Sequence, residues 1–218
     1  MTRRRFYAPP EAFTARDAGA TVRLTQEESR HLRDVLRLKA GDEAFVFDGA
    51  GNEYLCAVAG HEGGRHTAAT LKVRERVRPP HAESPLRLSL GVALLKGEKF
   101  DLVVQKATEL GASRIMPVVT KRADVRLRDE GDAAKRTTRW QRLAVEAAKQ
   151  SGRARVPEVA VPAPFASVIS AAPSTDSAER FSLRLLFAER GGRTLAEIVE
   201  GARGEAHTNV AALVGPEG

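Results

Sequence analysis

The sequence predicts an α/β protein of two domains, a small antiparallel β-barrel followed by a larger domain with a mainly parallel sheet. Short strand-like runs separated by Gly-rich turns occupy the first third of the 218 residues. A regular alternation of strand and helix patterns occupies the rest. Between the two, a segment with three prolines has the composition of an interdomain linker. We therefore expect domains at 1–77 and 86–218, joined by a linker at 78–85.

The first domain is predicted to hold four strands and one helix. Thr25 and Glu28 form a capping box ahead of an apolar stripe, which predicts the start of the helix. Tyr54, Cys56 and Val58 share one face of a strand, so we expect Cys56 to be buried in the core. The expected strands are 21–24, 43–47, 53–59 and 67–77, with turns at 48–52 and around 63–64.

The second domain alternates strands with helices, a pattern typical of parallel sheets. In such sheets, ligands bind at the carboxyl ends of the strands. Thr194 and Glu197 form a second capping box, which predicts the start of the last helix. The expected strands are 86–95, 114–120, 183–188 and 210–214, and the other expected helices are 98–110 and 136–151.

Composition favours a polyanionic partner. The chain has 35 basic and 28 acidic residues, a formal net charge of +7 that is spread over both domains. No run approaches the roughly 18 apolar residues of a membrane span, and the first residues predict no signal peptide. The single cysteine excludes an internal disulfide and favours a reducing compartment, so we expect a cytoplasmic protein.

Several enzyme motifs are absent from the sequence. It has no Gly-x-Gly-x-x-Gly after a strand, no P-loop and no Gly-x-Ser-x-Gly elbow. The five histidines and one cysteine lack the spacing of metal ligands, so we expect no metal site. Hydrolase and metalloenzyme functions therefore lose support.

Two predicted helices carry mixed polar faces. In the helix 98–110 the opposite face is an apolar stripe of Phe100, Val103, Val104, Ala107 and Leu110, which we expect to be buried. Each polar face is either a solvated surface or a surface that contacts RNA or a partner subunit. The first face includes Glu98, Lys99, Lys106 and Glu109, and the second includes Gln150, with Arg153 at the exit of its helix.

Basic residues form two groups in the first domain. Arginines at 3–5 precede Phe6 and Tyr7, and this group is either a disordered terminus or an RNA contact. The second group includes Arg33, Arg37 and Lys39, and arginines recurring at helical spacing suit the neutralisation of phosphates.

Two strands of the second domain break into polar or Gly-rich sequence. The first ends near Leu186 and Phe187, and the second is the run 213–218, LVGPEG. Glycine at such a break lets backbone approach a ligand closely, although an ordinary turn has the same pattern.

The chain resembles the RsmE family across nearly its whole length. Short runs that match the family occur in the family's order, and their combination is far more specific than any one of them. In chain order these runs are VLRL at 35–38, GD at 41–42, FDG at 47–49, KGEK at 96–99, QKATELG at 105–111, EAAKQSGR at 146–153, VPE at 156–158 and LVGPEG at 213–218.

The resemblance implies a methyltransferase that uses S-adenosylmethionine to methylate N3 of a uridine in 16S rRNA of the small ribosomal subunit. It implies a SPOUT-type domain, a trefoil-knotted α/β fold that works as a homodimer, preceded by a PUA-like barrel that binds RNA. In the family, some tens of residues follow the Gly-Pro-Glu-Gly loop and complete the knot and the cofactor site. We therefore expect a further segment beyond Gly218, without which the knot, the pocket and the dimer are incomplete.

The resemblance also assigns roles to residues. For removal of the N3 proton our own hypothesis is a carboxylate such as Glu109 or Glu217, and Arg153 is a further catalytic candidate. The cofactor site would include Leu186, Phe187, Leu213, Val214, Gly215, Glu217 and Gly218. RNA would contact Arg5, Arg33, Arg37, Lys39, Glu98, Lys99, Lys106 and Gln150.

Methyl transfer from a sulfonium is a direct displacement, so it requires alignment and removal of the N3 proton but no metal. The uridine must be unpaired or flipped out to expose N3. Two other functions stay open, a SPOUT methyltransferase that acts on another RNA and a non-catalytic RNA-binding or ribosome-assembly factor.

Overall fold

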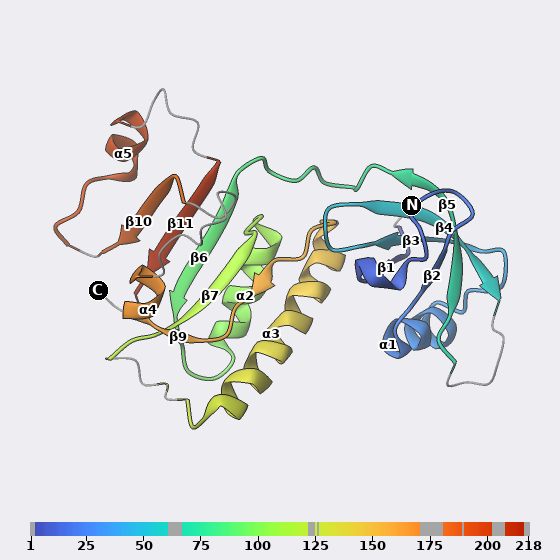
Figure 1. Cartoon of the computed structure of the whole chain (residues 1–218), viewed down its shortest axis with the longest axis horizontal. Helices are drawn as coiled ribbons and strands as arrows, with labels where there is room; N and C mark the ends of the chain where they lie inside the picture. The colour runs from blue at the N-terminus through green and yellow to red at the C-terminus, as the bar shows by residue number, and fades with distance from the viewer. Residues whose placement is uncertain are drawn as a thin grey trace. The chain divides into compact units, whose positions relative to one another are not determined.

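The computed structural model describes residues 3–60, 67–121, 125, 127–170, 181–188, 190–201 and 208–215. The chain divides into two compact units (Figure 1). The first unit contains Met1–Glu83 together with Val145–Val156, and the second contains Ser84–Ala144 and Pro157–Gly218.

The first unit is built on a five-stranded sheet with the order β1-β3-β4-β5-β2. Its strands are β1 (Arg5–Tyr7), β2 (Thr21–Arg23), β3 (Glu43–Phe47), β4 (Glu53–Gly60) and β5 (Thr70–Val77). β1 pairs with β3 in parallel, whereas the other neighbours are antiparallel. The sheet is therefore mixed, and the prediction of a wholly antiparallel sheet was wrong at β1. Three residues are too few to show a strand period in the sequence.

The core of the first unit confirms the predicted burial along β4. Tyr54, Cys56 and Val58 are all nearly or fully buried. Burial in apolar surroundings raises the pKa of the Cys56 thiol to about 12, so the thiol is neutral at physiological pH. The turn between β3 and β4 is held by Asp48, whose carboxylate accepts hydrogen bonds from the backbone N–H groups of Ala50 and Asn52.

The predicted helix of the first unit is present as α1 (Gln26–Arg30), which continues into a π-helical turn, η2 (His31–Val35). Thr25 is its N-cap, because Thr25 Oγ1 accepts a hydrogen bond from the Glu28 N–H at 3.2 Å. The backbone then turns at Arg37, whose φ of 53° is the left-handed conformation that non-glycine residues rarely adopt. A short 3₁₀ helix, η1 (Pro10–Ala12), follows β1.

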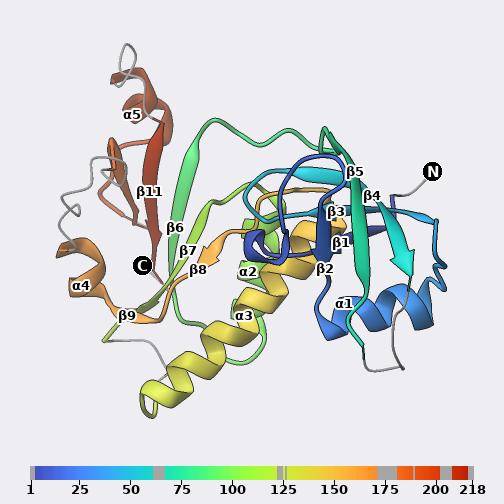
Figure 2. The ribbon, with the colours of Figure 1, turned by 45° about the vertical axis from the view of Figure 1, so that its right-hand side comes forward.

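The second unit confirms the predicted α/β domain with a parallel sheet. The strand order is β10-β11-β6-β7-β8, with β9 also on β7, and every pair is parallel. Its strands are β6 (Arg87–Ala93), β7 (Arg114–Val119), β8 (Glu158–Val159), β9 (Ala163–Pro164), β10 (Leu183–Phe187) and β11 (Asn209–Val214). Its helices are α2 (Lys99–Glu109), α4 (Phe165–Ser170), α5 (Leu195–Gly201) and the part of α3 (Glu130–Ser151) up to Ala144. β11, β6 and β7 lie side by side in both views (Figure 1, Figure 2).

Helix α3 begins six residues before its predicted start at Arg136. Asp129 Oδ1 accepts a hydrogen bond from the Asp132 N–H at 2.7 Å, and Asp132 pairs with Arg136 one turn later. These polar contacts support a first turn that the apolar period alone does not indicate. Neither β8, β9 nor α4 was predicted, because each has only two to six residues.

The apolar stripe of α2 is confirmed except at its end. Phe100, Val104 and Ala107 are buried, and the Phe100 ring lies 4.5 Å from that of Trp140. Leu110 was predicted on the same stripe but is 86% exposed, because it is the C-cap residue beyond the last turn. No helix in the described ranges is long and apolar enough to cross a membrane.

Candidate functional site

The carboxyl ends of β10, β11 and β6 form one edge of the parallel sheet. β10 and β11 pair so that Leu186 lies opposite Leu213 and Phe187 lies opposite Val214. On the other side of β11, Val214 lies opposite Val92 of β6. The structure therefore brings together the two strand breaks that the sequence marked as candidate cofactor-binding segments.

Apolar side chains at this edge are open to solvent, unlike those in the middle of β11. Leu186 is 62% exposed, Phe187 47% and Val214 40%, whereas Ala211 and Ala212 are buried. Clustered exposed apolar side chains are typical of surfaces that bind a ligand or another segment. Gly215 follows β11 and is exposed, and Glu217 and Gly218 lie outside the described residues.

Gly91 of β6 makes room for one of these side chains. A Cβ atom at Gly91 would come within 2.3 Å of Leu213 Cδ2, closer than any real contact. Since Gly91 and Leu213 are also paired in the sheet, the glycine sets the position of Leu213 at this edge.

The mixed polar face of α2 begins next to the same edge, because α2 follows β6. Glu98 and Lys99 are exposed at its first turn, and Glu98 is the N-cap residue without a side-chain capping bond. At the other end, Glu109 accepts hydrogen bonds from Lys106 Nζ at 2.6 Å and from Gln105 Nε2 at 2.8 Å. The bond from Lys106, followed by that from Gln105, lowers the pKa of the Glu109 carboxyl. Glu109 is therefore ionised at neutral pH.

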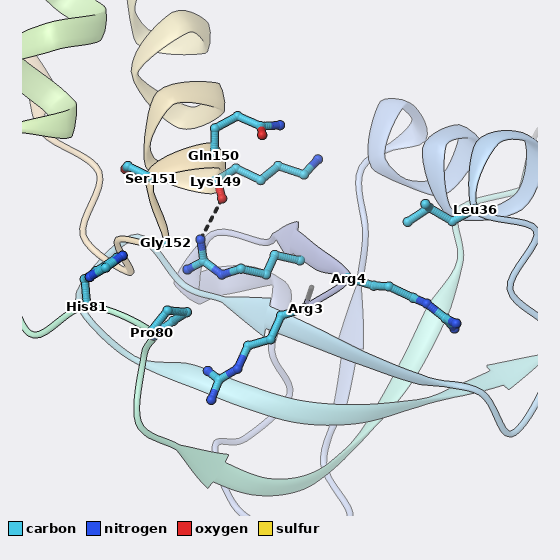
Figure 3. A pocket seen from close by; sticks show the side chains of 10 residues that line it. Arg3, Arg4, Leu36, Pro80, His81, Lys149, Gln150, Ser151 and Gly152 are labelled. Carbon is cyan, nitrogen blue, oxygen red and sulfur yellow. Dashed lines mark hydrogen bonds between the residues drawn. The ribbon is translucent and has the colours of Figure 1, made fainter. Parts of the chain in front are cut away.

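The first unit contains a basic cavity of about 640 Å³ (Figure 3). Four chain segments line it, namely the N-terminal arginines, Leu36 after η2, the residues after β5 and the end of α3. The lining residues are Arg3, Arg4, Arg5, Leu36, Pro80, His81, Lys149, Gln150, Ser151 and Gly152. Its volume lies within the range of about 300–1,000 Å³ that is typical of ligand pockets.

Arg5 is buried beneath this cavity and holds the end of α3. Its Nε donates to Glu53 Oε1 at 2.7 Å. Its two terminal nitrogens donate to the carbonyl oxygens of Ala148, Lys149 and Arg153, at 2.8 to 3.1 Å. These carbonyls belong to the last turn and exit of the helix, where backbone carbonyls lack N–H partners further along the helix. The structure thus places Arg5, a predicted RNA contact, within the protein interior.

Two further ion pairs join the end of α3 to other parts of the first unit. Lys149 Nζ lies 2.8 Å from both carboxylate oxygens of Glu28. Burial raises the pKa of Glu28, an effect that the hydrogen bond from Lys149 opposes. Arg153 is 5% exposed and its Nη2 lies 2.6 Å from Glu83 Oε2. Arg153, a predicted catalytic residue, therefore lies in a buried ion pair.

The remaining predicted RNA contacts of the first unit differ in their surroundings. Arg33 Nη1 donates to the Thr67 carbonyl at 2.6 Å, whereas Arg37, Lys39 and Gln150 are exposed. Of these, only Gln150 lines the cavity. Sequence reasoning did not select Lys149, Pro80 or His81 as site residues, since charge patterns on a single helix do not show which distant segments surround it.

Both units of the chain match known families of RNA methyltransferase domains. An RNA methyltransferase domain profile matches residues 82–218, and an RNA methyltransferase PUA domain profile matches residues 24–63. The two units therefore define the class of the protein. It is an RNA methyltransferase with a PUA-like unit followed by a parallel-sheet domain, as expected from the sequence.

The chain is similar to several proteins named RsmE. Ribosomal RNA small subunit methyltransferase E (RsmE) from Synechocystis is 35% identical over 158 residues, 72% of this chain and 48% of the relative. RsmE from Bacillus subtilis is 32% identical over 139 residues, 64% of this chain and 52% of the relative. The chain thus spans about half the length of these relatives. The structure of RsmE from Neisseria gonorrhoeae bound to S-adenosylmethionine matches with a TM-score of 0.78 and 29% identity, over 98% of this chain and 80% of that one. The chain belongs to the RNA methyltransferase family, and its similarity to RsmE proteins agrees with the resemblance seen in the sequence.

Proposed function

We propose that this protein transfers the methyl group of S-adenosylmethionine to N3 of a uridine in 16S rRNA of the small ribosomal subunit. The observation that carries the proposal is the edge at which β10, β11 and β6 end together, with Leu186, Phe187 and Val214 exposed. Relatives named as small-subunit rRNA methyltransferases support the choice of substrate, and a related structure with bound S-adenosylmethionine supports the choice of cofactor.

The residues at this edge fit an adenosine group. The exposed side chain of Leu186 and the half-buried Leu213 opposite it supply an apolar surface for the adenine ring, and Phe187, on the other face of the strand, is assigned to a further part of the cofactor site. The backbone at Gly215 can come close to the ligand because the residue has no Cβ. Val214, Glu217 and Gly218 complete the set that we assign to the cofactor. When bound, the cofactor supplies an electrophilic methyl group.

The protein's own residues have to orient the uracil ring and accept its N3 proton. Glu109 has the negative charge that the second task requires, since hydrogen bonds from Lys106 and Gln105 keep it ionised, but it lies at the end of α2 remote from the strand edge. The same bonds weaken it as a base, so Glu217 stays the alternative acceptor. In either case the N3 proton passes to a carboxylate as the N3–methyl bond forms. Glu98, Lys99 and Lys106 are the α2 residues that we propose to contact the substrate, and we keep Arg153 as a further catalytic candidate.

We further propose that residues 1–77 bind RNA, that 78–85 link them to the methyltransferase domain at 86–218, and that the protein acts as a cytoplasmic homodimer. Within residues 1–77 we still propose that RNA contacts Arg33, Arg37 and Lys39. The trefoil knot stays a prediction.

The decisive experiment is calorimetric titration of the full-length protein with S-adenosylmethionine, followed by methylation of small-subunit RNA from a strain lacking the gene. Mass mapping of the product should locate one methyl group on uridine N3. Leu186→Asp should abolish cofactor binding, while Val161→Asp, with a side chain 59% exposed outside the edge, should not. A full-length protein that binds no cofactor but retains RNA affinity would be an RNA-binding factor instead. A methyl group found on another RNA would contradict the choice of substrate.

A further inference from the structure

The amino ends of β6, β7 and β11 form a second polar edge of the parallel sheet. Because every pair of strands is parallel, this edge is opposite to the one at which Leu186 and Val214 are exposed. It contains a cavity of about 100 Å³. The polar residues that line the cavity are Arg87, Ser89, Ser113, Arg114, Glu158 and Asn209, all of which belong to the second unit. Neither the proposed cofactor site nor the predicted RNA contacts include any of them.

The register of the sheet gathers these side chains on one face. Asn209 of β11 lies opposite Arg87 of β6. Two residues further along β6, and therefore on the same face, Ser89 lies opposite Arg114 of β7. Arg114 in turn lies opposite Glu158 of β8. Since paired residues project to the same side of a sheet, these five polar side chains form one row across four neighbouring strands.

Arg114 has a hydrogen-bond donor that lacks an acceptor. Its Nη2 donates to Glu158 Oε1 at 3.3 Å, and both side chains of this pair are partly open to solvent. Its Nε, by contrast, is buried, and no acceptor for it is found among the residues that the structure describes. A buried N–H of a charged group that loses its bonds to water destabilises the folded protein unless a partner replaces them. An anion in the cavity that Arg114 lines can supply this partner.

The lining of this cavity has a surplus of positive charge. Arg87 is exposed, and in the described part of the chain its side chain makes no hydrogen bond or ion pair. Arg87 and Arg114 are therefore balanced by a single carboxylate, that of Glu158. The Arg114–Glu158 pair is open to solvent, and pairs of this kind contribute little to stability, so it opposes an entering anion only weakly. The net charge of the lining attracts an anion.

The size of the cavity and the type of its donors indicate which anion fits. Pockets for drug-sized ligands measure about 300–1,000 Å³, so this cavity suits a compact ion instead. A guanidinium can donate two parallel hydrogen bonds to an oxyanion. Ser89 is 5% exposed and adds a hydroxyl donor, whereas the Ser113 hydroxyl already donates to the Leu88 carbonyl at 3.0 Å. Two guanidinium groups and one hydroxyl match the oxygen atoms of a tetrahedral phosphate.

We propose that this edge of the sheet binds inorganic phosphate, with Arg87 and Arg114 as its charged ligands and Ser89 as a hydroxyl donor. The site lies at the opposite ends of the strands from the proposed cofactor site and does not depend on the proposed function. A free oxyanion is favoured over a nucleic-acid strand, because the cavity is small and Glu158 leaves its lining only one net positive charge.

The test is calorimetric titration of the full-length protein with inorganic phosphate, at constant ionic strength and with neither S-adenosylmethionine nor RNA present. Arg87→Ala and Arg114→Ala should each weaken phosphate binding about tenfold. Arg114→Lys keeps the charge but has no Nε donor, so it should recover only part of the loss. Arg142→Ala removes an exposed arginine of α3 that does not line the cavity, and it should leave the affinity unchanged.

Phosphate binding that is no tighter than that of chloride, or that is unchanged in Arg87→Ala, would overturn the proposal. So would equal losses in Arg87→Ala and Arg142→Ala, because they would indicate a diffuse effect of net charge. A single-stranded oligonucleotide that binds at Arg87 and Arg114 more tightly than phosphate would assign the edge to nucleic acid instead. The Arg87 side chain is exposed and makes no bond, so Arg87→Ala serves as a test even if Arg114→Ala does not fold. Failure of methyl transfer does not affect a titration that contains neither cofactor nor RNA.

Discussion

Arg5 and Glu53 form an ion pair that is buried at both ends, with Nε 2.7 Å from Oε1 and side-chain exposures of 6% and 0%. The guanidinium also lies over the Phe47 ring, 4.6 Å from its centroid. The pair joins β1 to β4, and the remaining N–H groups of Arg5 reach the end of α3. One buried side chain therefore connects three elements of the first unit.

Loss of one partner of this pair should destabilise the first unit. Arg5→Ala leaves Glu53 buried, with only Arg3 as a partner, and uncaps α3, so we expect a loss of about 3–5 kcal/mol in the free energy of unfolding. Urea unfolding followed by far-UV circular dichroism measures it, with Arg74→Ala as the control. A change below about 0.5 kcal/mol would show that the pair has no structural role.

Substitution by alanine should lower the free energy of unfolding more at Gly152 than at Gly41. Gly152 has a φ of 77° and faces His81, whereas Gly41, in the same unit, has a φ of 90° and nothing within 4 Å of the position that a Cβ would take. Left-handed alanine costs about 1–2 kcal/mol in both variants. The clash should add about 1–3 kcal/mol at Gly152 alone. His81→Ala in the Gly152→Ala background should recover the difference, and equal losses at both glycines would contradict the contact.

Gly91 and Leu213 should be coupled energetically. Gly91→Ala forces the Leu213 side chain to move, which should cost about 1–3 kcal/mol. In the background of Leu213→Ala the cost should nearly vanish, giving a measurable interaction energy in a double-mutant cycle. Fluorescence of Trp140, the single tryptophan and a buried residue of the second unit, reports this unfolding. If the two substitutions change the free energy of unfolding additively, residues 91 and 213 are not in contact.

The Glu109 carboxyl should titrate below its ordinary range. Its pKa is lowered by hydrogen bonds from Lys106 and Gln105, so any stability that these bonds provide is present above about pH 4.5 and is lost as the pH falls through the lowered pKa. Lys106→Met should raise the pKa toward its usual value, as followed by carbon NMR of the carboxyl. A pKa that is unaffected by Lys106→Met would show that the pair does not persist in solution.

The Cys56 thiol should resist alkylation in the folded protein. It is fully buried and its pKa is raised to about 12, so at pH 8 it is both inaccessible and protonated. Iodoacetamide should label it only after unfolding in urea. The raised pKa also means that its contribution to stability is present below about pH 9 and declines as the pH rises toward 12. Equal labelling rates with and without urea would contradict its burial.

Local sequence determined most elements of this protein, because side-chain periodicity records which face of a helix or strand is buried. The burial of Cys56, the apolar stripe of α2 and the parallel sheet all follow from such patterns. The strand breaks near Leu186 and Val214 lie side by side because β10 and β11 are parallel neighbours. Periodicity was insufficient for β1 and β8, which are too short to show it.

Only the tertiary structure decided which charged residues face solvent. The three arginines at 3–5 are alike in sequence, yet Arg5 is buried against Glu53 and Arg4 is exposed at the cavity. Partners of this kind are far apart in the chain, 48 residues for Arg5 and Glu53 and 121 for Glu28 and Lys149. An ion pair depends on distance in space, and the pattern of charges along one segment does not contain it. For this reason the sequence indicated a basic RNA-binding protein, whereas the fold separates the arginine that supports the structure from those that we propose to bind the RNA.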